Sequence, residues 1–389
     1  MASRFLAIVF SLVLCLANVA LAASWRVELD GSGDFTEIQP AVDAAAPGDT
    51  VLIGPGRFDT FHECVAPGWT EETVVSLLKD DLVLIGSGQE VTIIGPKTYY
   101  GGFGKDPKGI CSFDGYSGWV QDLTIENVEE AIYWWTGHLE VERCTMRADS
   151  PWFAGIFGTF SSASIRECLI EAQITNLDAA SAILLATGST DVEVLSTKFT
   201  GGGYGIRASN QSSGIRIEDC EFDGSVLGIS FDTNSSGEVR HCVFANPTGA
   251  ALAATNLCHI VCASLHATGG DRGVIVAGSS VIEGTNLIIE GTTGAAIQLH
   301  SAGVVDIHNS HILPATGLAV ECVEYLSDPR IVDLTDNFWG TADADSINAL
   351  IVDGSDNPNS HYTVLFEPFA TGPVPTEKKS IGSVKSMFR

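Results

Sequence analysis

Basic residues are scarce in this sequence. The chain carries 20 Lys and Arg residues against 48 Asp and Glu residues, which gives a formal net charge of −28 at pH 7. A surface with this charge repels nucleic acid phosphates and anionic membranes, and it favours solubility or cation binding. We therefore expect no nucleic acid partner for this protein.

Long apolar runs are missing after the first 22 residues. No later segment approaches the ~20 apolar residues that span a bilayer, so no transmembrane segment is expected in the mature chain. Residues 1–22 have the pattern of a secretory signal peptide, with Arg4, an apolar run from Phe5 to Leu16, and Ala20-Leu21-Ala22 as the cleavage site. The pattern predicts a secreted protein, whether extracellular, periplasmic or held at the cell surface.

The cysteines show no zinc pattern and no obvious disulfide framework. Removal of Cys15 with the signal would leave nine, an odd number, and Cys258 and Cys262 lack the Cys-x-x-Cys spacing of zinc ligands. Four others occupy the same position of the repeat, which favours an internal stack of small apolar side chains. Neighbouring rungs lie ~4.8 Å apart, so a cross-link within the stack is the alternative. These four are Cys144, Cys168, Cys220 and Cys242.

What the sequence does contain is a repeat of about two dozen residues. A small residue followed by an aliphatic one returns every 22 to 27 residues, and a second phrase, aliphatic-x-x-small-x-aliphatic, follows 8 to 14 residues behind each copy. Two registers that advance together indicate one supersecondary unit stacked many times. The aliphatic members of the first phrase are Ile132, Ile156, Ile183, Ile206, Ile229, Leu252, Val274, Ile297 and Val320.

The repeat unit predicts an all-β parallel β-helix. β-branched residues alternate in short bursts between Gly, Ser and Asn, and no repeat holds a helix-length amphipathic run or a leucine-rich signature. We expect residues 1–22 to be a signal peptide, 23–370 one β-helix domain, and 371–389 a basic tail. Thr36 and Gln39 form a capping-box pattern, which predicts a short helix that seals the N-terminal end. A second short helix is expected over 343–351.

The opening of the mature chain resembles a known superfamily. The segments Asp30 to Gln39 and Gly48 to Ile53 are similar to the N-terminal coil of pectin methylesterases and of other exported right-handed β-helix proteins of the pectin-lyase-like superfamily. The repeats resemble its parallel β-helix repeats (PbH1), and residues 337–366 resemble the closing segment of bacterial members. The resemblance implies a right-handed parallel β-helix. The catalytic signatures of pectin methylesterases, polygalacturonases and pectate lyases are absent, so none of these activities is implied.

Outward-facing side chains should stack into two columns. Residues one and three positions after each inward aliphatic point outward, and the period places them above one another. The first column contains Tyr133, Phe157, Leu184, Arg207, Ser230, Ala253, Ile275, Gln298 and Glu321, and the second contains Trp135, Thr159, Ala186, Ser209, Asp232, Thr255, Ala277, His300 and Val323.

Three aromatic residues at the start of these columns are candidates for substrate binding. Tyr133, Trp135 and Phe157 could form a platform on which the apolar faces of sugar rings stack. The alternative is a small satellite core that a loop carrying Tyr99 covers.

Arg207 and Asp232 are the candidate catalytic residues, since they lie on neighbouring coils. The arginine could neutralise a uronate, and the aspartate could act as acid, base or cation ligand. The alternative is a surface ion pair worth ~0–1 kcal/mol. Gln298 and His300, together with Glu321, form a second polar cluster that could bind substrate or simply be a solvated face.

The sequence holds no complete set of metal ligands. His308 and His311 fall on either side of an expected corner, so they should not converge with Asp306 on one ion. Asp353 and its neighbours at 356–357 could hold Ca²⁺, but they lack a full calcium-loop pattern and are also good turn formers. Ca²⁺ is therefore the sole cofactor considered.

These observations leave two functions open. The first is a glycan-binding or cell-surface module, whose partner is a polysaccharide or cell-surface glycan, without recognisable catalytic residues. The second is a polysaccharide lyase or glycoside hydrolase that acts on a uronate-containing polysaccharide. We expect a monomer, with a trimeric spike as the structural alternative.

Overall fold

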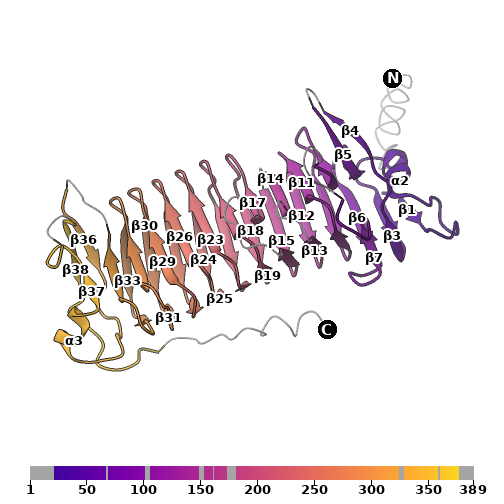
Figure 1. Cartoon of the computed structure of the whole chain (residues 1–389). Coiled ribbons are helices and arrows are strands. Elements are labelled where there is room, and N and C mark those ends of the chain that lie inside the picture. The colour runs from indigo at the N-terminus through magenta and orange to yellow at the C-terminus, as the bar shows by residue number, and fades with distance from the viewer. Residues whose placement is uncertain are drawn as a thin grey trace, which may run out of the picture.

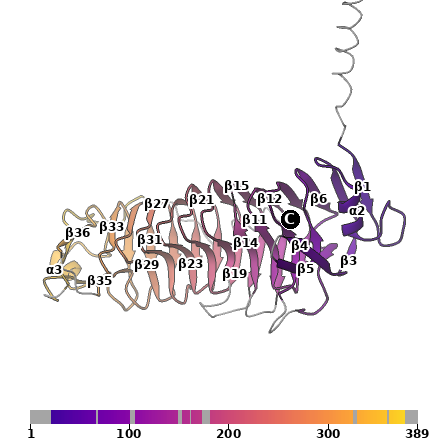
Figure 2. The same cartoon turned by 90° about the horizontal axis from the view of Figure 1, so that it is seen from above.

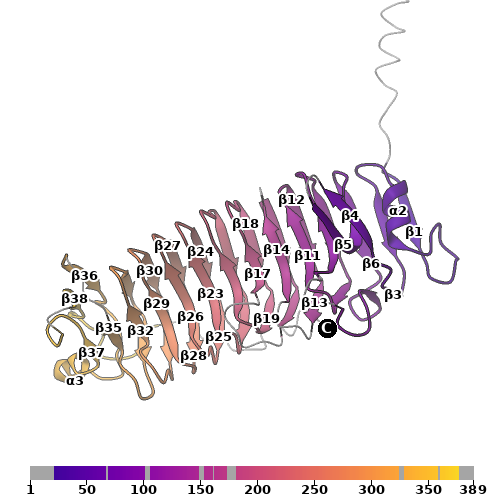
Figure 3. The same ribbon diagram turned by 45° about the horizontal axis from the view of Figure 1, so that its top comes forward.

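The computed structural model describes residues 22–66, 69–100, 106–148, 153–160, 162–172, 181–323, 328–357 and 360–375. The chain winds into a parallel β-helix in which each coil contributes strands to up to three sheets, A, B and C. Figures 1 to 3 show the strands side by side along an elongated body, with β1 and α2 at one end and α3 at the other. The predicted all-β architecture is confirmed.

The strands of each sheet follow one another in coil order. Within the described residues, the 14 strands of sheet A are β1 (Ser24–Val27), β2 (Thr50–Ile53), β6 (Leu82–Gly86), β9 (Gly118–Gln121), β12 (His138–Glu142), β15 (Ser162–Arg166), β18 (Val192–Leu195), β21 (Ile215–Glu218), β24 (Ser236–Arg240), β27 (His259–Ala263), β30 (Val281–Thr285), β33 (Val304–His308), β36 (Arg330–Asp333) and β38 (Tyr362–Leu365).

Sheet B is the shortest of the three. In the described part of the chain its 11 strands are β3 (Gly56–Phe58), β7 (Thr92–Ile94), β10 (Thr124–Glu126), β13 (Thr145–Ala148), β16 (Leu169–Ala172), β19 (Lys198–Gly201), β22 (Glu221–Asp223), β25 (Val243–Ala245), β28 (His266–Thr268), β31 (Ile288–Glu290) and β34 (His311–Leu313).

Sheet C carries the two predicted columns. Its 13 described strands are β4 (His62–Ala66), β5 (Trp69–Ser76), β8 (Lys108–Ser112), β11 (Glu130–Trp135), β14 (Ala154–Thr159), β17 (Ser181–Leu185), β20 (Tyr204–Ala208), β23 (Leu227–Asp232), β26 (Ala250–Thr255), β29 (Arg272–Val276), β32 (Ile297–Leu299), β35 (Val320–Cys322) and β37 (Ile351–Val352). The first two strands form an antiparallel hairpin, and β5 then pairs in parallel with β8.

The core is built from the repeated aliphatic residues. Each aliphatic of the first phrase, from Ile132 to Val320, pairs in register with its counterpart on the next coil, and all of them are buried. Aromatic side chains stack in the same way along sheet B. Phe222 lies between Phe199 and Phe244, with ring centroids 4.6 Å and 4.9 Å apart. Residues one repeat apart in the sequence therefore lie in successive layers of one core.

The corner between sheets A and B explains the second phrase. At this corner one residue is in the left-handed region, with φ between +48° and +60°, so the chain turns within one residue. The residues with this conformation are Asp122, Arg143, Glu167, Ser196, Asp219, His241, Ser264, Asn286, Asn309 and Asp336.

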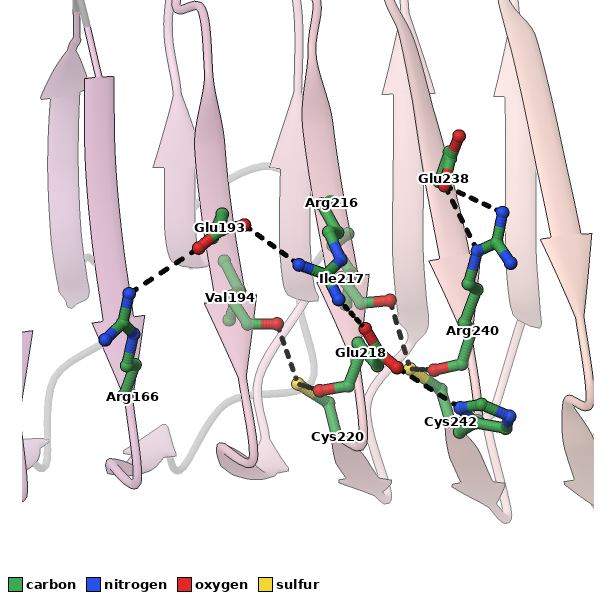
Figure 4. Close-up of polar contacts among 11 residues, drawn as sticks. Arg166, Glu193, Val194, Arg216, Ile217, Glu218, Cys220, Glu238, Arg240 and Cys242 are labelled. Atoms are coloured by element: carbon green, nitrogen blue, oxygen red, sulfur yellow. Dashed lines mark hydrogen bonds and ion pairs between the residues drawn. The ribbon is translucent and has the colours of Figure 1, made fainter.

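A short donor side chain follows most of these corners. The thiols of Cys144, Cys168, Cys220 and Cys242 each donate to the carbonyl oxygen two residues earlier, at 3.2–3.4 Å. Figure 4 shows Cys220 and Cys242 in this arrangement. All nine described cysteines are free and buried. The predicted internal stack is thus confirmed, and it supplies hydrogen-bond donors as well as apolar surface.

Two short helices lie at the ends of the described chain. The helix α2 (Ile38–Ala44) buries Ile38, Ala41 and Val42 against the first coils, as expected for a cap. The predicted capping box is wrong, because Glu37 is the N-cap residue and makes no side-chain cap bond. Gln39 instead accepts a hydrogen bond from the Ser76 backbone N–H, so a tertiary contact replaces the local one.

The second helix, α3 (Ala344–Asn348), is shorter than the predicted range of 343–351. Asp343 caps it by accepting a hydrogen bond from the Ser346 N–H at 3.1 Å. Among the described residues, no helix combines the length and apolar character needed to cross a membrane. Residues 1–21 of the predicted signal peptide and most of the basic tail lie outside the described residues.

Candidate functional site

The outer face of sheet C carries the first predicted column. Its members pair in register on consecutive coils from Tyr133 to Glu321. Of the second column, two neighbouring pairs lie within strands, Trp135 with Thr159 and Asp232 with Thr255. The predicted register of the first column is therefore confirmed, but four of its members, Tyr133, Ser230, Ala253 and Gln298, are buried.

The aromatic residues at its start are packed together rather than displayed. Tyr133 is only 6% exposed and belongs to a small cluster with Cys64, Cys111 and Phe113. Phe157 stacks on Tyr133 with ring centroids 5.4 Å apart, and Trp135 packs against the cluster. Burial raises the pKa of Tyr133 to about 12. This arrangement favours the satellite-core interpretation of the three aromatics.

The cover over this cluster comes from the β4–β5 hairpin, not from Tyr99. Cys64 of β4 is part of the cluster, whereas Tyr99 packs against the main core and donates to Glu129 at 3.2 Å. The hairpin precedes the regular repeats, so the period could not reveal it.

Arg207 and Asp232 meet further along the face, where both side chains are partly exposed. The guanidinium Nη2 lies 3.4 Å from Oδ2 of Asp232 and stacks over the ring of Tyr204, with Cζ 5.0 Å from the centroid. Oδ1 of Asp232 also accepts hydrogen bonds from Thr255 Oγ1 at 3.0 Å and Asn256 Nδ2 at 2.8 Å. Side chains from three consecutive coils converge on this one carboxylate.

These contacts fix the charge state of Asp232. Partial burial raises its pKa, but hydrogen bonds from Asn256, Thr255, Thr233 and Arg207 outweigh burial and hold the pKa below the usual value. The carboxylate is therefore ionised at neutral pH and is a weak base. It is suited to accept hydrogen bonds from a ligand rather than to exchange protons.

Gln298 and His300 form a second polar cluster three coils further along. Gln298 Nε2 donates to Glu321 Oε2 at 2.6 Å, and Gln298 Oε1 lies 3.0 Å from His300 Nε2. The three coils place this cluster ~14 Å from Asp232 along the helix axis. The sequence therefore located two polar clusters on one face.

The metal candidates do not converge. His308 Nε2 contacts Asp306 Oδ1 at 2.6 Å, but His311 lies beyond the corner and its Nε2 contacts the Val374 carbonyl oxygen at 2.9 Å. Both carboxylate oxygens of Asp353 accept backbone N–H groups, as expected for a turn former. In the described ranges, no group of three or more His, Cys, Asp and Glu side chains is arranged to hold a metal ion.

A buried charge cluster beside Tyr133 was missed from the sequence. Lys108 is 1% exposed, and its Nζ lies 2.7 Å from Asp106, 2.6 Å from Glu130 and 3.7 Å from Glu71. Burial raises the pKa of Glu130 to about 7. Burial lowers the pKa of Lys108, but the carboxylates raise it further and leave it above the ordinary value. Three carboxylates thus share one ammonium group.

The sequence contained a signal for this cluster. Lys108-Gly109-Ile110 is an earlier copy of the phrase Glu130-Ala131-Ile132, and the two pair in register. Extending the period back by one coil would have placed Lys108 directly beside Glu130.

The outer face of sheet A differs in character, because it carries exposed ion pairs. Figure 4 shows Arg216 between Glu193 and Glu218, with Arg166 on the other side of Glu193. One oxygen of Glu193 lies 3.0 Å from Arg216, and the other lies 3.6 Å from Arg166. Such exposed pairs are worth ~0–1 kcal/mol each and weaken in salt. This face is a solvated charged surface and provides a control for experiments on sheet C.

Comparison with known proteins supports the fold and leaves the ligand open. The family model described as right handed beta helix region matches residues 108–268 and 181–333. No curated protein matches the chain.

Two glucanases are among the solved structures that share the fold. The catalytic unit of a thermostable GH87 alpha-1,3-glucanase from Streptomyces thermodiastaticus strain HF3-3 is 12% identical, with 92% of this chain and 70% of that chain covered and a TM-score of 0.53. The catalytic domain of a GH87 alpha-1,3-glucanase in complex with tetrasaccharides is 10% identical, with 90% and 69% covered and a TM-score of 0.51.

Proposed function

The chain belongs to the right handed beta helix family, and from this premise we propose that it is a secreted module that binds a neutral glycan along the outer face of sheet C. The observation that carries the proposal is the convergence of Arg207, Thr255 and Asn256 on Asp232. Groups held by neighbours lose little conformational entropy when a ligand binds, which favours recognition of hydroxyl groups.

A neutral glycan fits this face better than a uronate. The charge of Arg207 is compensated by Asp232, and the chain as a whole carries a formal charge of −28. A polyanion would therefore meet a repulsive field without a free cation on this site. The two solved structures named above are alpha-1,3-glucanases, one of them in complex with tetrasaccharides, and they support a carbohydrate as the ligand.

The geometry favours binding over turnover. Abstraction of an α-proton in a lyase needs a base whose pKa lies near the working pH, whereas the pKa of Asp232 is lowered. A hydrolase needs two carboxyl groups ~5–9.5 Å apart. In the described strands of the first column, the carboxylate nearest to Asp232 is Glu321, four coils and ~19 Å away along the axis.

Binding can be tested by affinity electrophoresis in gels that contain neutral α-glucan, neutral β-glucan or polygalacturonate, with and without Ca²⁺. We expect retardation by a neutral glucan, and at least a tenfold loss of affinity in Asp232→Ala and Arg207→Ala. Arg216→Ala on sheet A is the matched control and should bind like the wild type. The proposal fails if every gel leaves the protein unretarded, or if the control loses as much affinity as the sheet C variants.

Turnover is tested in the same samples. New reducing ends or unsaturated-product absorbance would show that the protein is an enzyme and would overturn the binding-module proposal. Secretion rests on the pattern of residues 1–22. An exported form whose N-terminus is Ala23 would support it, whereas retention of the unprocessed chain in the cytoplasm would contradict it.

A further inference from the structure

Two thiols meet beneath the β4–β5 hairpin. Cys64 lies on β4 and Cys111 on β8, two strands away in sheet C, yet both side chains are buried in the Tyr133 cluster. The thiols hydrogen bond to each other. They also share a neighbour, since Cys111 Sγ lies 3.8 Å from Ser76 Oγ and Cys64 hydrogen bonds to the same side chain.

The corner cysteines are in a different situation. Cys220 and Cys242 are also in contact, but each thiol points at main-chain carbonyl groups, and each belongs to a coil that is paired on both sides. Forming a bond between them would require the loss of these hydrogen bonds inside the rigid part of the solenoid.

The hairpin, in contrast, lies at the edge of sheet C. The strand β4 pairs with β5 alone, and Val65, next to Cys64, is 67% exposed. Strands at a sheet edge open locally at low cost, which can bring Cys64 into contact with a dissolved disulfide. The hydrogen bond from Cys111 lowers the pKa of Cys64, which favours its thiolate. Burial raises the pKa of the Cys111 thiol.

We propose that Cys64 and Cys111 form a disulfide bond when the protein meets a low-molecular-weight disulfide such as oxidised glutathione. The Cys64 thiolate attacks one glutathione sulfur, forms a mixed disulfide and releases a glutathione thiolate, which takes up a proton. Cys111 then loses its proton to water and attacks the Cys64 sulfur, releasing the second glutathione. Two protein thiols are oxidised, and one glutathione disulfide is reduced to two thiols.

The bond would join the hairpin to the first regular coil and hold it over Tyr133. It would cross-link β4 to β8 without relying on the strand pairing of β4 with β5. The inference does not depend on glycan binding, because β8 lies five strands from β23, which carries Asp232, and β4 lies further away.

The test is a map of the thiols after incubation of the purified protein in a glutathione redox buffer. Remaining thiols are alkylated in denaturant, and the unreduced digest is analysed by mass spectrometry. We expect one cross-linked species that joins the peptides of Cys64 and Cys111, with the other described cysteines alkylated. Complete alkylation of both cysteines, or a cross-link between Cys220 and Cys242 in their place, would overturn the proposal.

Two variants test the order of the steps. Cys111→Ser lacks the second thiol, so Cys64 should accumulate as its glutathione adduct. Cys220→Ser is the matched control and should form the same cross-link as the wild type. An unmodified Cys64 in the Cys111→Ser variant would contradict the assignment of Cys64 as the attacking thiol. Mass spectrometry identifies each modified cysteine directly. The wild-type map therefore decides the proposal even if a variant folds poorly.

Discussion

Removal of the buried ammonium group of Lys108 should destabilise the N-terminal coils in a pH-dependent way. In the wild type, Glu130 has a pKa of about 7, against an ordinary value of 4.5. Because the folded pKa is raised, the stability that Glu130 contributes is complete below pH ~4.5 and is lost as the pH rises through about 7. The difference corresponds to about 3 kcal/mol, as an order of magnitude.

The variant Lys108→Met leaves Glu130, Glu71 and Asp106 without their shared cation. Loss of one partner from a buried ion pair costs about 3–5 kcal/mol when the other partner stays charged. At pH 8 we expect a loss of this size. At pH 5 the loss should fall below about 2 kcal/mol, because Glu130 is then protonated and a neutral carboxyl group is less costly to bury.

The assay is urea unfolding of both proteins at pH 5 and pH 8, followed by tryptophan fluorescence. Trp134 is fully buried one coil from Lys108 and reports on this region. The double variant Lys108→Met/Glu130→Gln serves as the control and should recover most of the loss at pH 8. An equal loss at both pH values, with no recovery in the double variant, would refute the electrostatic explanation.

Two further predictions concern the core. Asn337 is fully buried and makes three hydrogen bonds to main-chain groups at 2.6–2.9 Å, so Asn337→Ala should cost about 3 kcal/mol and lower the thermal midpoint at the C-terminal end. Phe222→Ala should cost about 3–5 kcal/mol, because it opens a cavity between Phe199 and Phe244. Calorimetry checks both, and glycan affinity per folded molecule should be unchanged in each.

The fold was largely predictable because one period governs most of the chain. Ile206, Ile229 and Leu252 are separated by one repeat each, and so are the outward-facing residues that follow them. The columns on sheet C can therefore be predicted from the repeat length and from the alternation of side chains along a strand. The period carries this information because each coil contacts mainly its own neighbours.

The site was predictable only where the repeats are regular. The outward column allowed either an exposed Tyr133 or a satellite core under the Tyr99 loop, but the cover comes from the β4–β5 hairpin, which lies before the repeats. The capping box failed for a similar reason, since Gln39 is engaged by Ser76 from a distant strand. The contacts of segments outside the repeats have no regular spacing in the sequence, so the repeat pattern cannot predict them.

Because the single-residue corners are equivalent, such a molecule can lose or gain whole coils. From β9 to β36, each described coil leaves sheet A by the same left-handed step. Excision of residues 252–273 would join Ala251 to Val274, and the severed ends would meet in the positions that Ala251 and Leu252 hold now. Insertion or deletion of whole coils between them would then change the distance between Asp232 and Gln298 along the axis in steps of ~4.8 Å. The spacing of two sites on this face can therefore take only a set of discrete values.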